Sequence, residues 1–431
     1  MTKHLRLFLL GLLNFTLFSQ TAYSQEDQND KNFSIKVGGY VKYDMYHDSR
    51  QTIDAREGHL LLWPKYKEFD SEGKDINARN SFNFLAIQSR INLKLTGPDV
   101  FNAKTLGYIE GEFFGHSNSD INGFRLRHAY IKLDWHKSGL LMGQFWHPLF
   151  ITDCFPGTLS FNTGLGFQPF SRNPQIKYTY KLGEIINLKF TIFSERDFPS
   201  RGMDGSASSS YVRNSGIPSL NFNLQYSNKE ESLSNYITVG IAGNYKSMLP
   251  QLTTSADYIT NQKINAFSAI AYINKRFKQI DVKMAATYGE NTTDFFMLGG
   301  FATYDTLDYI TKEVSYKPLR NIAAWIDIST TGSKWQFGVF GGYNKNIGAS
   351  KDLSENVNEV KNHIYGYFNE ISYLYRISPR IYYYIKNFQI GAELECSVAA
   401  YGNGEYNLKG RPVGVSEVVN YRILLGVYYH F

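Results

Sequence analysis

Two features are scarce in this sequence: cysteine, with two residues in 431, and long hydrophobic runs, of which one occurs, before residue 19. A helix needs ~20 apolar residues to cross a bilayer, so we predict no transmembrane helix in the rest of the chain. Cys154 and Cys396 are expected to be unpaired, so an exported chain of this size must be stabilised without a disulfide framework. Proline is also rare, with 12 residues, whereas tyrosine and phenylalanine are abundant, with 32 and 31.

Catalytic signatures are missing as well. The sequence has no GxSxG, HExxH or Walker motif, and no GxGxxG at a strand–helix junction. We therefore expect no enzyme activity, no metal site and no cofactor. The net charge of +6 is modest for a chain of this length and does not indicate a nucleic-acid partner.

The first residues have the pattern of a signal peptide. The basic segment KHLR precedes a short apolar run from Leu7 to Phe18, and AYS at 22–24 is a small-x-small cleavage site. We predict that the signal peptide comprises residues 1–24, that a short linker follows at 25–32, and that a membrane barrel extends from 33 to 431.

Alternation of apolar and polar residues recurs along the whole mature chain, and this period of two is typical of half-buried β-strands. We predict sixteen strands, at about 33–46, 81–95, 103–114, 123–135, 139–146, 173–181, 186–195, 219–227, 235–246, 263–275, 279–289, 320–330, 333–343, 364–385, 388–401 and 419–431. Bacterial outer-membrane barrels require an even number. The predicted fold is therefore all-β, a transmembrane antiparallel barrel. Pro379 predicts a bulge or an early turn in the fourteenth strand.

The connections between these strands alternate in length. Short ones, such as GPDVFNA and YKLGE, alternate with long ones at 47–80, 147–172, 196–218, 290–318 and 344–363. A soluble β-sandwich is not expected to alternate short and long connections. A membrane barrel is, because its periplasmic turns are short and its extracellular loops are long.

The last strand ends on an aromatic residue with no polar tail. From Tyr421 to Phe431 the sequence alternates, and aromatic residues stand at both limits of one apolar face. This pattern is typical of a strand that crosses a bilayer with its rings at the two interfaces. We predict that Phe431 is an assembly signal, which the barrel assembly machinery reads.

The strand face opposite the lipid must line a lumen, and it carries charges of both signs. The residues predicted to line the pore and contact the solute are Arg90, Glu110, Glu112, Arg125, Arg127, Arg172 and Lys177. Two interpretations stay open. Opposite charges pair across neighbouring strands, or the arginines form a basic ladder that draws an anionic solute into the pore. A drift of the alternation in the fourth strand predicts a bulge near His128.

The third long connection, HPLFITDCFPGTLSFNTGLGFQPFSR at 147–172, is less polar than a solvated loop should be. It is rich in Phe, Gly and Pro and has a single acid, Asp153. We predict that it folds inward and constricts the pore. The alternative is that it covers a contact between subunits.

Five stretches carry a resemblance to a known family: AIQSRINLKLTGPD, GYIEGEFFG, FRLRHAYIKLDW, LLMGQFWHPL and RNPQIKYTY. Over residues 35–182 the chain resembles the DcaP-like porins. The resemblance implies a sixteen-stranded trimeric channel for dicarboxylates and other small anions. It maps charged motif positions of that family onto Arg90, Glu110, Glu112, Arg125, Arg127 and Arg172. Only residues 25–32 separate the predicted signal peptide from the first strand, so the coiled-coil extension of some relatives is expected to be missing.

These observations predict an outer-membrane porin of a Gram-negative cell. We expect a homotrimer in outer-membrane lipid through which small anionic solutes, such as dicarboxylates, diffuse. The alternative is a barrel whose long loops mediate adhesion or bind a partner, with incidental conduction. The length of the 47–80, 196–218 and 290–318 connections supports this alternative.

Overall fold

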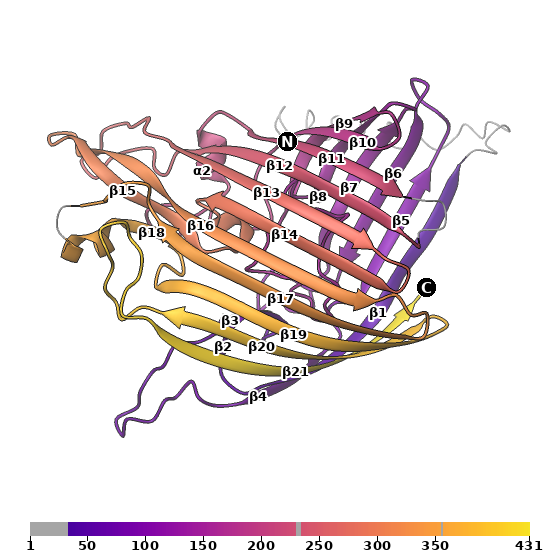
Figure 1. The fold of residues 1–431 in the computed structure, drawn as a ribbon. Coiled ribbons are helices and arrows are strands. Elements are labelled where there is room, and N and C mark those ends of the chain that lie inside the picture. The colour runs from indigo at the N-terminus through magenta and orange to yellow at the C-terminus, as the bar shows by residue number, and fades with distance from the viewer. Residues whose placement is uncertain (1–32, 230–233, 355–356) are drawn as a thin grey trace, which may run out of the picture.

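The computed structural model describes residues 33–229, 234–354 and 357–431, which form an antiparallel β-barrel (Figure 1). The predicted signal peptide 1–24 and linker 25–32 lie outside the described residues. Sixteen strand positions make up the wall, one of them shared by β4 and β5, so the predicted fold class is confirmed. The wall strands are β1 (Ser34–Asp48), β4 (Ser81–Leu85), β5 (Arg90–Thr96), β6 (Lys104–Glu112), β7 (Arg125–Asp134), β8 (Ser138–Trp146), β9 (Arg172–Leu182), β10 (Ile186–Phe193), β11 (Ser219–Lys229), β12 (Tyr236–Met248), β13 (Ile264–Arg276), β14 (Ile280–Glu290), β16 (Glu313–Thr330), β17 (Trp335–Gly348), β19 (Ile371–Ile385), β20 (Phe388–Tyr401) and β21 (Ser416–His430).

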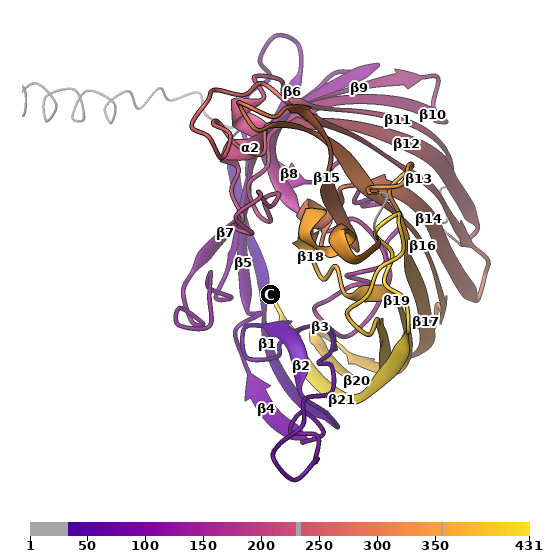
Figure 2. The same cartoon turned by 90° about the vertical axis from the view of Figure 1, so that its left-hand side faces the viewer.

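The barrel closes between its first and last strands (Figure 2). β1 pairs with β21 in a register that joins Tyr40 to His430 and Asp48 to Arg422. On its other edge, β1 pairs with β5 and then with β4. Each wall position therefore has a partner on both edges, which leaves no open sheet edge in the described wall to face lipid.

The alternation of short and long connections is present in the structure. The turns at 97–103, 135–137, 277–279 and 386–387 are short and lie at the same end of the barrel as the carboxyl terminus. At the other end the connections are long, and they contain the elements that do not belong to the wall. These are β2 (Thr52–Ala55), β3 (Leu60–Pro64), α2 (Ser210–Asn214), η1 (Thr293–Phe295), β15 (Gly299–Asp308), η2 (Val357–His363) and β18 (Ile364–Tyr367).

The predicted strand at 364–385 is wrong at its start. Its first residues form β18, which pairs with β15 rather than with the wall. Phe368 has a φ of 60°, which interrupts the extended backbone, and the wall strand begins at Ile371. None of the helices in the described part of the chain is long and apolar enough to cross a membrane.

The structure overturns the predicted irregularity at Pro379. β19 passes through Pro379 without a register shift, and the proline stays opposite Val339 of β17. Its missing N–H only interrupts the ladder to β20, which skips Ser378 and Pro379 and resumes in the same register at Arg380.

The bulge predicted near His128 is confirmed. Glu110 of β6 lies opposite His128, but the next residue, Gly111, lies opposite Leu126, so β7 has one extra residue at this point.

The two faces of the wall have opposite chemistry, as β21 shows. Its outward side chains, from Tyr421 to Tyr429, are 37–55% exposed, and they are apolar or aromatic. Asn420 and Arg422 point inward and are at most 1% exposed. A wall that is apolar outside and polar inside is suited to lipid. The chain is therefore a multi-pass barrel of the outer-membrane type.

The carboxyl terminus is fixed in the closing seam. The N–H of Phe431 donates to the carbonyl of Gly39 at 3.1 Å, and the N–H of Gly39 donates back to the carbonyl of Phe431 at 3.2 Å. Gly39 has a φ of 154°, and a Cβ atom there would lie 2.1 Å from the carbonyl oxygen of Arg90. This position therefore requires glycine.

Deleting Phe431 is predicted to lower the amount of folded barrel in the membrane, because two closing hydrogen bonds and the terminal ring are lost together. Heat-modifiable migration on gels measures the folded fraction. Phe431→Asp keeps the backbone bonds and should also lower the yield, through the ring alone. Channels that do fold should conduct normally, and an unchanged yield with altered conductance would contradict this prediction.

Candidate functional site: a buried arginine cluster in the pore wall

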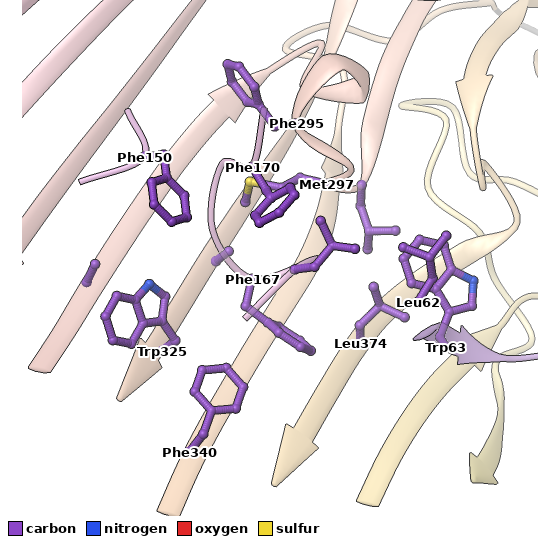
Figure 3. Close-up of a cluster of buried hydrophobic side chains, with 14 of the residues drawn as sticks. Leu62, Trp63, Phe150, Phe167, Phe170, Phe295, Met297, Trp325, Phe340 and Leu374 are labelled. Atoms are coloured by element: carbon purple, nitrogen blue, oxygen red, sulfur yellow. The ribbon is translucent and has the colours of Figure 1, made fainter. Parts of the chain in front are cut away.

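Several long connections fold into the barrel and pack against its inner wall (Figure 3). Trp63 comes from β3, Phe167 and Phe170 come from the segment between β8 and β9, and Phe295 comes from η1. They form one hydrophobic cluster with inward side chains of the wall, including Trp325, Phe340 and Leu374. The interior is thus partly filled by the chain's own loops.

We call residues 147–171 the strap, because this segment crosses the lumen. It leaves β8, returns to β9, and is bonded to β20 in between. The N–H of Leu159 donates to the carboxylate of Glu393, and Asn162 Nδ2 donates to Glu395 Oε1 at 2.9 Å. The strap therefore lies against the inner face of β20.

Glu112 of β6 lies at the centre of a buried group of arginines on β5, β7 and β9. Arg125 donates to Glu112 Oε1 from Nη2 at 2.6 Å and from Nε at 3.1 Å, and Arg127 Nη1 donates to the same oxygen at 2.8 Å. Arg90 Nη2 donates to Oε2 at 3.0 Å. A fourth guanidinium, that of Arg172, has Nη1 4.0 Å from Oε1. The carboxylate itself is fully buried.

Two further carboxylates balance most of the remaining charge. Glu110 accepts a hydrogen bond from Arg127 Nε at 2.7 Å, and Asp197 is 2.7 Å from Arg172 Nη2. We call these seven residues, the four arginines with Glu110, Glu112 and Asp197, the arginine cluster. Four guanidinium groups face three carboxylates, so the cluster keeps one positive charge in excess.

Strand register brings the cluster together. Arg90 lies opposite Glu112 in the β5–β6 ladder, and Glu112 lies opposite Arg125 in the β6–β7 ladder. The bulge in β7 then places Arg127 and His128 on the same inner face, which strict alternation would not allow. The short sequence FRLRH thereby contributes three basic side chains to one place in the wall.

Aromatic rings cover the guanidinium planes. Arg125 lies 4.6 Å from the ring centre of Phe114, and Arg127 and Arg172 lie 5.6 and 5.3 Å from that of Trp146. Guanidinium groups are attracted to ring faces and are more weakly hydrated than ammonium groups, so they tolerate this environment. The low local dielectric strengthens the ion pairs and makes any unpaired charge costly.

Most of the predicted pore residues meet in this cluster: Arg90, Glu110, Glu112, Arg125, Arg127 and Arg172. Lys177 does not join them, and its Nζ lies 4.5 Å from the ring centre of Phe145. The sequence reasoning missed Asp197, because it lies in a loop where no strand period relates it to Arg172. It also missed Trp146, although the alternation of β8 could have placed that ring inward.

A cavity of about 390 Å³ adjoins the cluster. Arg90 and Arg127 line it from the wall, and Phe150 and Phe161 line it from the strap. The side chain of Arg90 is 17% exposed, more than that of Arg127, at 3%. A solute in the cavity would therefore meet the guanidinium of Arg90 first.

Other lumen charges also form ion pairs. At the closing seam, Arg422 is 2.6 Å from Asp48, and on the neighbouring strands Arg380 donates two hydrogen bonds to Asp327, at 2.8 and 2.9 Å. Glu395 lies 3.8 Å from Arg376 and 4.0 Å from Arg422, so charges of both signs are also combined here.

A further buried group joins two extracellular connections to β12. Lys246 Nζ is 2.7 Å from Asp294 and 3.6 Å from Glu195. Burial and the nearby carboxylate of Asp294 raise the pKa of Glu195 to about 7. Glu195 also accepts hydrogen bonds from the N–H and the hydroxyl of Ser200. This group anchors loops and adds little net charge near neutral pH.

No family model and no curated protein matches this chain, but solved structures do. The outer membrane channel DcaP of Acinetobacter baumannii is similar with a TM-score of 0.67 and 15% identity, over 93% of this chain and 97% of that one. An anion-selective porin from Comamonas acidovorans has a TM-score of 0.54 and 11% identity, over 93% of this chain and 100% of that one. In-vitro folded OmpT of Vibrio cholerae has a TM-score of 0.51 and 9% identity, over 93% of this chain and 98% of that one. Identities this low establish the fold alone. The chain has the fold of a porin-type barrel, and it shares this fold with the DcaP channel.

Glu112→Gln is predicted to destabilise the folded barrel by about 3–5 kcal/mol, because it leaves buried guanidinium groups without their common carboxylate. Glu72→Gln is the matched control, since Glu72 and Lys74 form an exposed pair at 2.6 Å and such pairs contribute ~0–1 kcal/mol. Urea unfolding of both variants in lipid vesicles measures the difference. Equal midpoints would show that Glu112 does not hold the cluster together.

Proposed function

We propose that this protein is an outer-membrane porin through which small anionic solutes, such as dicarboxylates, diffuse across the outer membrane. The porin-type fold and the apolar outer wall support the porin assignment. The anion assignment rests on one observation: the arginine cluster keeps one positive charge in excess beside a lumen cavity. The Comamonas porin of the same fold is described as anion-selective.

One excess charge is enough to bias a narrow pore. A charge in a confined, partly dehydrated passage is screened less than a charge on an open surface. The planar fork of Arg90 can bind a carboxylate with two hydrogen bonds. Because Arg90 already donates to Glu112, a solute has to compete for it, and binding is therefore weak enough to allow release.

We infer that the segment at 147–172 constricts the pore. Its strap is bonded to β20 on one side, and on the other side its phenylalanines line the cavity together with β5, β6, β7 and β8. Solutes then pass between the strap and the arginine cluster. A passage bounded by packed rings admits small molecules only.

The outer surface of the barrel and the closing seam between β1 and β21 indicate the other partners. Outward apolar side chains contact outer-membrane lipid, and the barrel assembly machinery reads Phe431. Three barrels associate as a homotrimer, as the resemblance to DcaP-like porins implies. The abundance of outward aromatic rings, such as Phe82 and Phe84, provides surface for that association.

Arg90→Gln is predicted to shift the reversal potential in a salt gradient towards cations and to slow dicarboxylate uptake into proteoliposomes. Lys74→Gln removes the same charge from an exposed loop and should change neither. The anion preference of the natural protein should weaken between ~0.1 M and ~1 M salt, where the Debye length falls from ~10 Å to ~3 Å. A natural channel that prefers cations at low salt would overturn the anion assignment.

A second function is favoured by the tips of two extracellular connections. Ile259 is 82% exposed, and Tyr309 and Ile310 are 77% and 79% exposed. The hydroxyl of Thr254 donates to the carbonyl of Thr311, so the two tips lie together. Exposed apolar patches are typical of protein contacts. In this alternative the loops mediate adhesion or bind a partner, and conduction is incidental.

Single-channel recording in planar bilayers separates the two functions. A barrel that stays closed at every salt concentration and voltage would favour partner binding. Under the porin function, the natural protein conducts, and the double variant Ile259→Ser, Ile310→Ser conducts equally well because these tips lie outside the lumen.

A further inference from the structure

Lumen-facing aromatic rings form an arc on the same wall as the arginine cluster. We define the aromatic arc as Tyr40, Tyr108, Tyr130, Phe145 and Tyr428, which come from β1, β6, β7, β8 and β21. Ring centres lie 5.3 Å apart for Tyr108 and Tyr130, 5.2 Å for Tyr130 and Phe145, and 5.3 Å for Tyr40 and Tyr428. All five residues are partly exposed, so the arc offers ring surface to a solute.

Arg90 connects the two parts of this arc. It lies on β5, between β1 and β6, and its guanidinium is 5.2 Å from the ring centre of Tyr40. Tyr40, Tyr108, Tyr130 and Phe145 line the same cavity of about 390 Å³ as Arg90. This volume falls within the ~300–1,000 Å³ typical of small-molecule sites. A cation and stacking surfaces are thus available to one solute.

The cavity also has polar groups that the described protein leaves unsatisfied. His128 lines it and is 5% exposed, and its Nδ1 has no hydrogen-bond partner among the described residues. Arg90 Nε also has no hydrogen-bond partner there, although it lies 3.7 Å from Glu110 Oε1. Buried polar atoms without partners cost free energy, so a ligand with hydroxyl groups would be stabilised here.

We propose that the aromatic arc binds sugar acids, which are pyranose rings that carry a carboxylate, and that these are the preferred anions of the pore. The C–H groups of such a ring are polarised by the neighbouring oxygens and stack on the negative faces of the tyrosines. The carboxylate reaches Arg90, and ring hydroxyls satisfy His128 and the phenol groups. This inference rests on the proposed porin function and specifies its solute.

Other classes of solute match fewer of these groups. A linear dicarboxylate pairs with Arg90 but covers little ring surface. An apolar ring acid stacks on the tyrosines but leaves Nδ1 of His128 without a hydrogen bond. A neutral sugar stacks and forms hydrogen bonds but lacks the charge that Arg90 attracts. Only the sugar acid matches the rings, the cation and the polar groups together.

Reversible block of the ion current by added solute measures this preference in planar bilayers. The solutes are glucuronate, cyclohexanecarboxylate, adipate and glucose, which represent the four classes. Glucuronate should bind most tightly to the natural protein. Tightest binding of cyclohexanecarboxylate, or equal binding of glucuronate and adipate, would overturn the proposal.

Variants of Tyr130 test the stacking. Tyr130→Leu should weaken glucuronate binding about threefold, the effect expected from loss of one aromatic contact, and should leave adipate binding unchanged. Tyr130→Phe keeps the ring and should retain most of the affinity. Tyr178→Leu is the control, because Tyr178 is 45% exposed on the outer wall.

The two levels of the proposal fail in different ways. Unchanged glucuronate binding in Tyr130→Leu would overturn the sugar-acid inference, while adipate and chloride conduction would still support the anion porin. A natural protein that conducts no anions would overturn the porin function itself, whatever glucuronate does.

Discussion

Each wall strand of this barrel has one face in lipid and one in the lumen, and this constraint decides where charge can go. The charged side chains that the strands carry must be accommodated inside, where the strap and other loops already occupy much of the space. They therefore pair with one another across neighbouring strands. Glu112 is where this pairing is densest, since three arginines donate to one buried carboxylate. The cluster is at once a structural element of the wall and a site of excess positive charge.

The strap and the solute are held by different parts of the wall. The strap is bonded to β20, where Glu393 and Glu395 accept its hydrogen bonds, and also to Asn344 of β17 and Tyr382 of β19. The arginine cluster, the aromatic arc and the cavity between them lie further round the barrel, from β21 through β1 to β8 and β9. Structural and solute-binding roles thus lie in neighbouring parts of the wall, and both rely on inward polar and charged side chains.

The fold followed from the sequence because strand period and connection length are local properties. All sixteen wall positions, the alternation of connections and the bulge near His128 were predictable in this way. The strand proposed at 364–385 was wrong at its start, because β18 is extended but pairs with β15, a choice that depends on tertiary contacts. Pro379 did not disturb its strand, since the register on both sides holds the backbone in place across one missing bond.

The site was predictable only in part. Five of the charged residues could be placed on neighbouring inner faces by counting alternate positions, which is why Arg90, Glu112 and Arg125 were found together. Arg172 precedes the strand predicted at 173–181, so alternation did not place it. Asp197 reaches Arg172 from an extracellular loop, and no period relates a loop residue to a strand. The tyrosines of the aromatic arc stand at inward positions of their strands, which the alternation predicts. Contact between their rings depends on strand register, which the sequence did not determine.

The strap also has a consequence for the order in which the molecule is built. The bond from Leu159 to Glu393 joins residues 234 positions apart along the chain. Contacts of such long range form late, because the intervening chain must first be arranged. In a barrel whose strands pair in sequence order, this bond cannot form until β20 has been added. The part of the strap around Leu159 would therefore reach its final position late, together with the closing strands of the barrel.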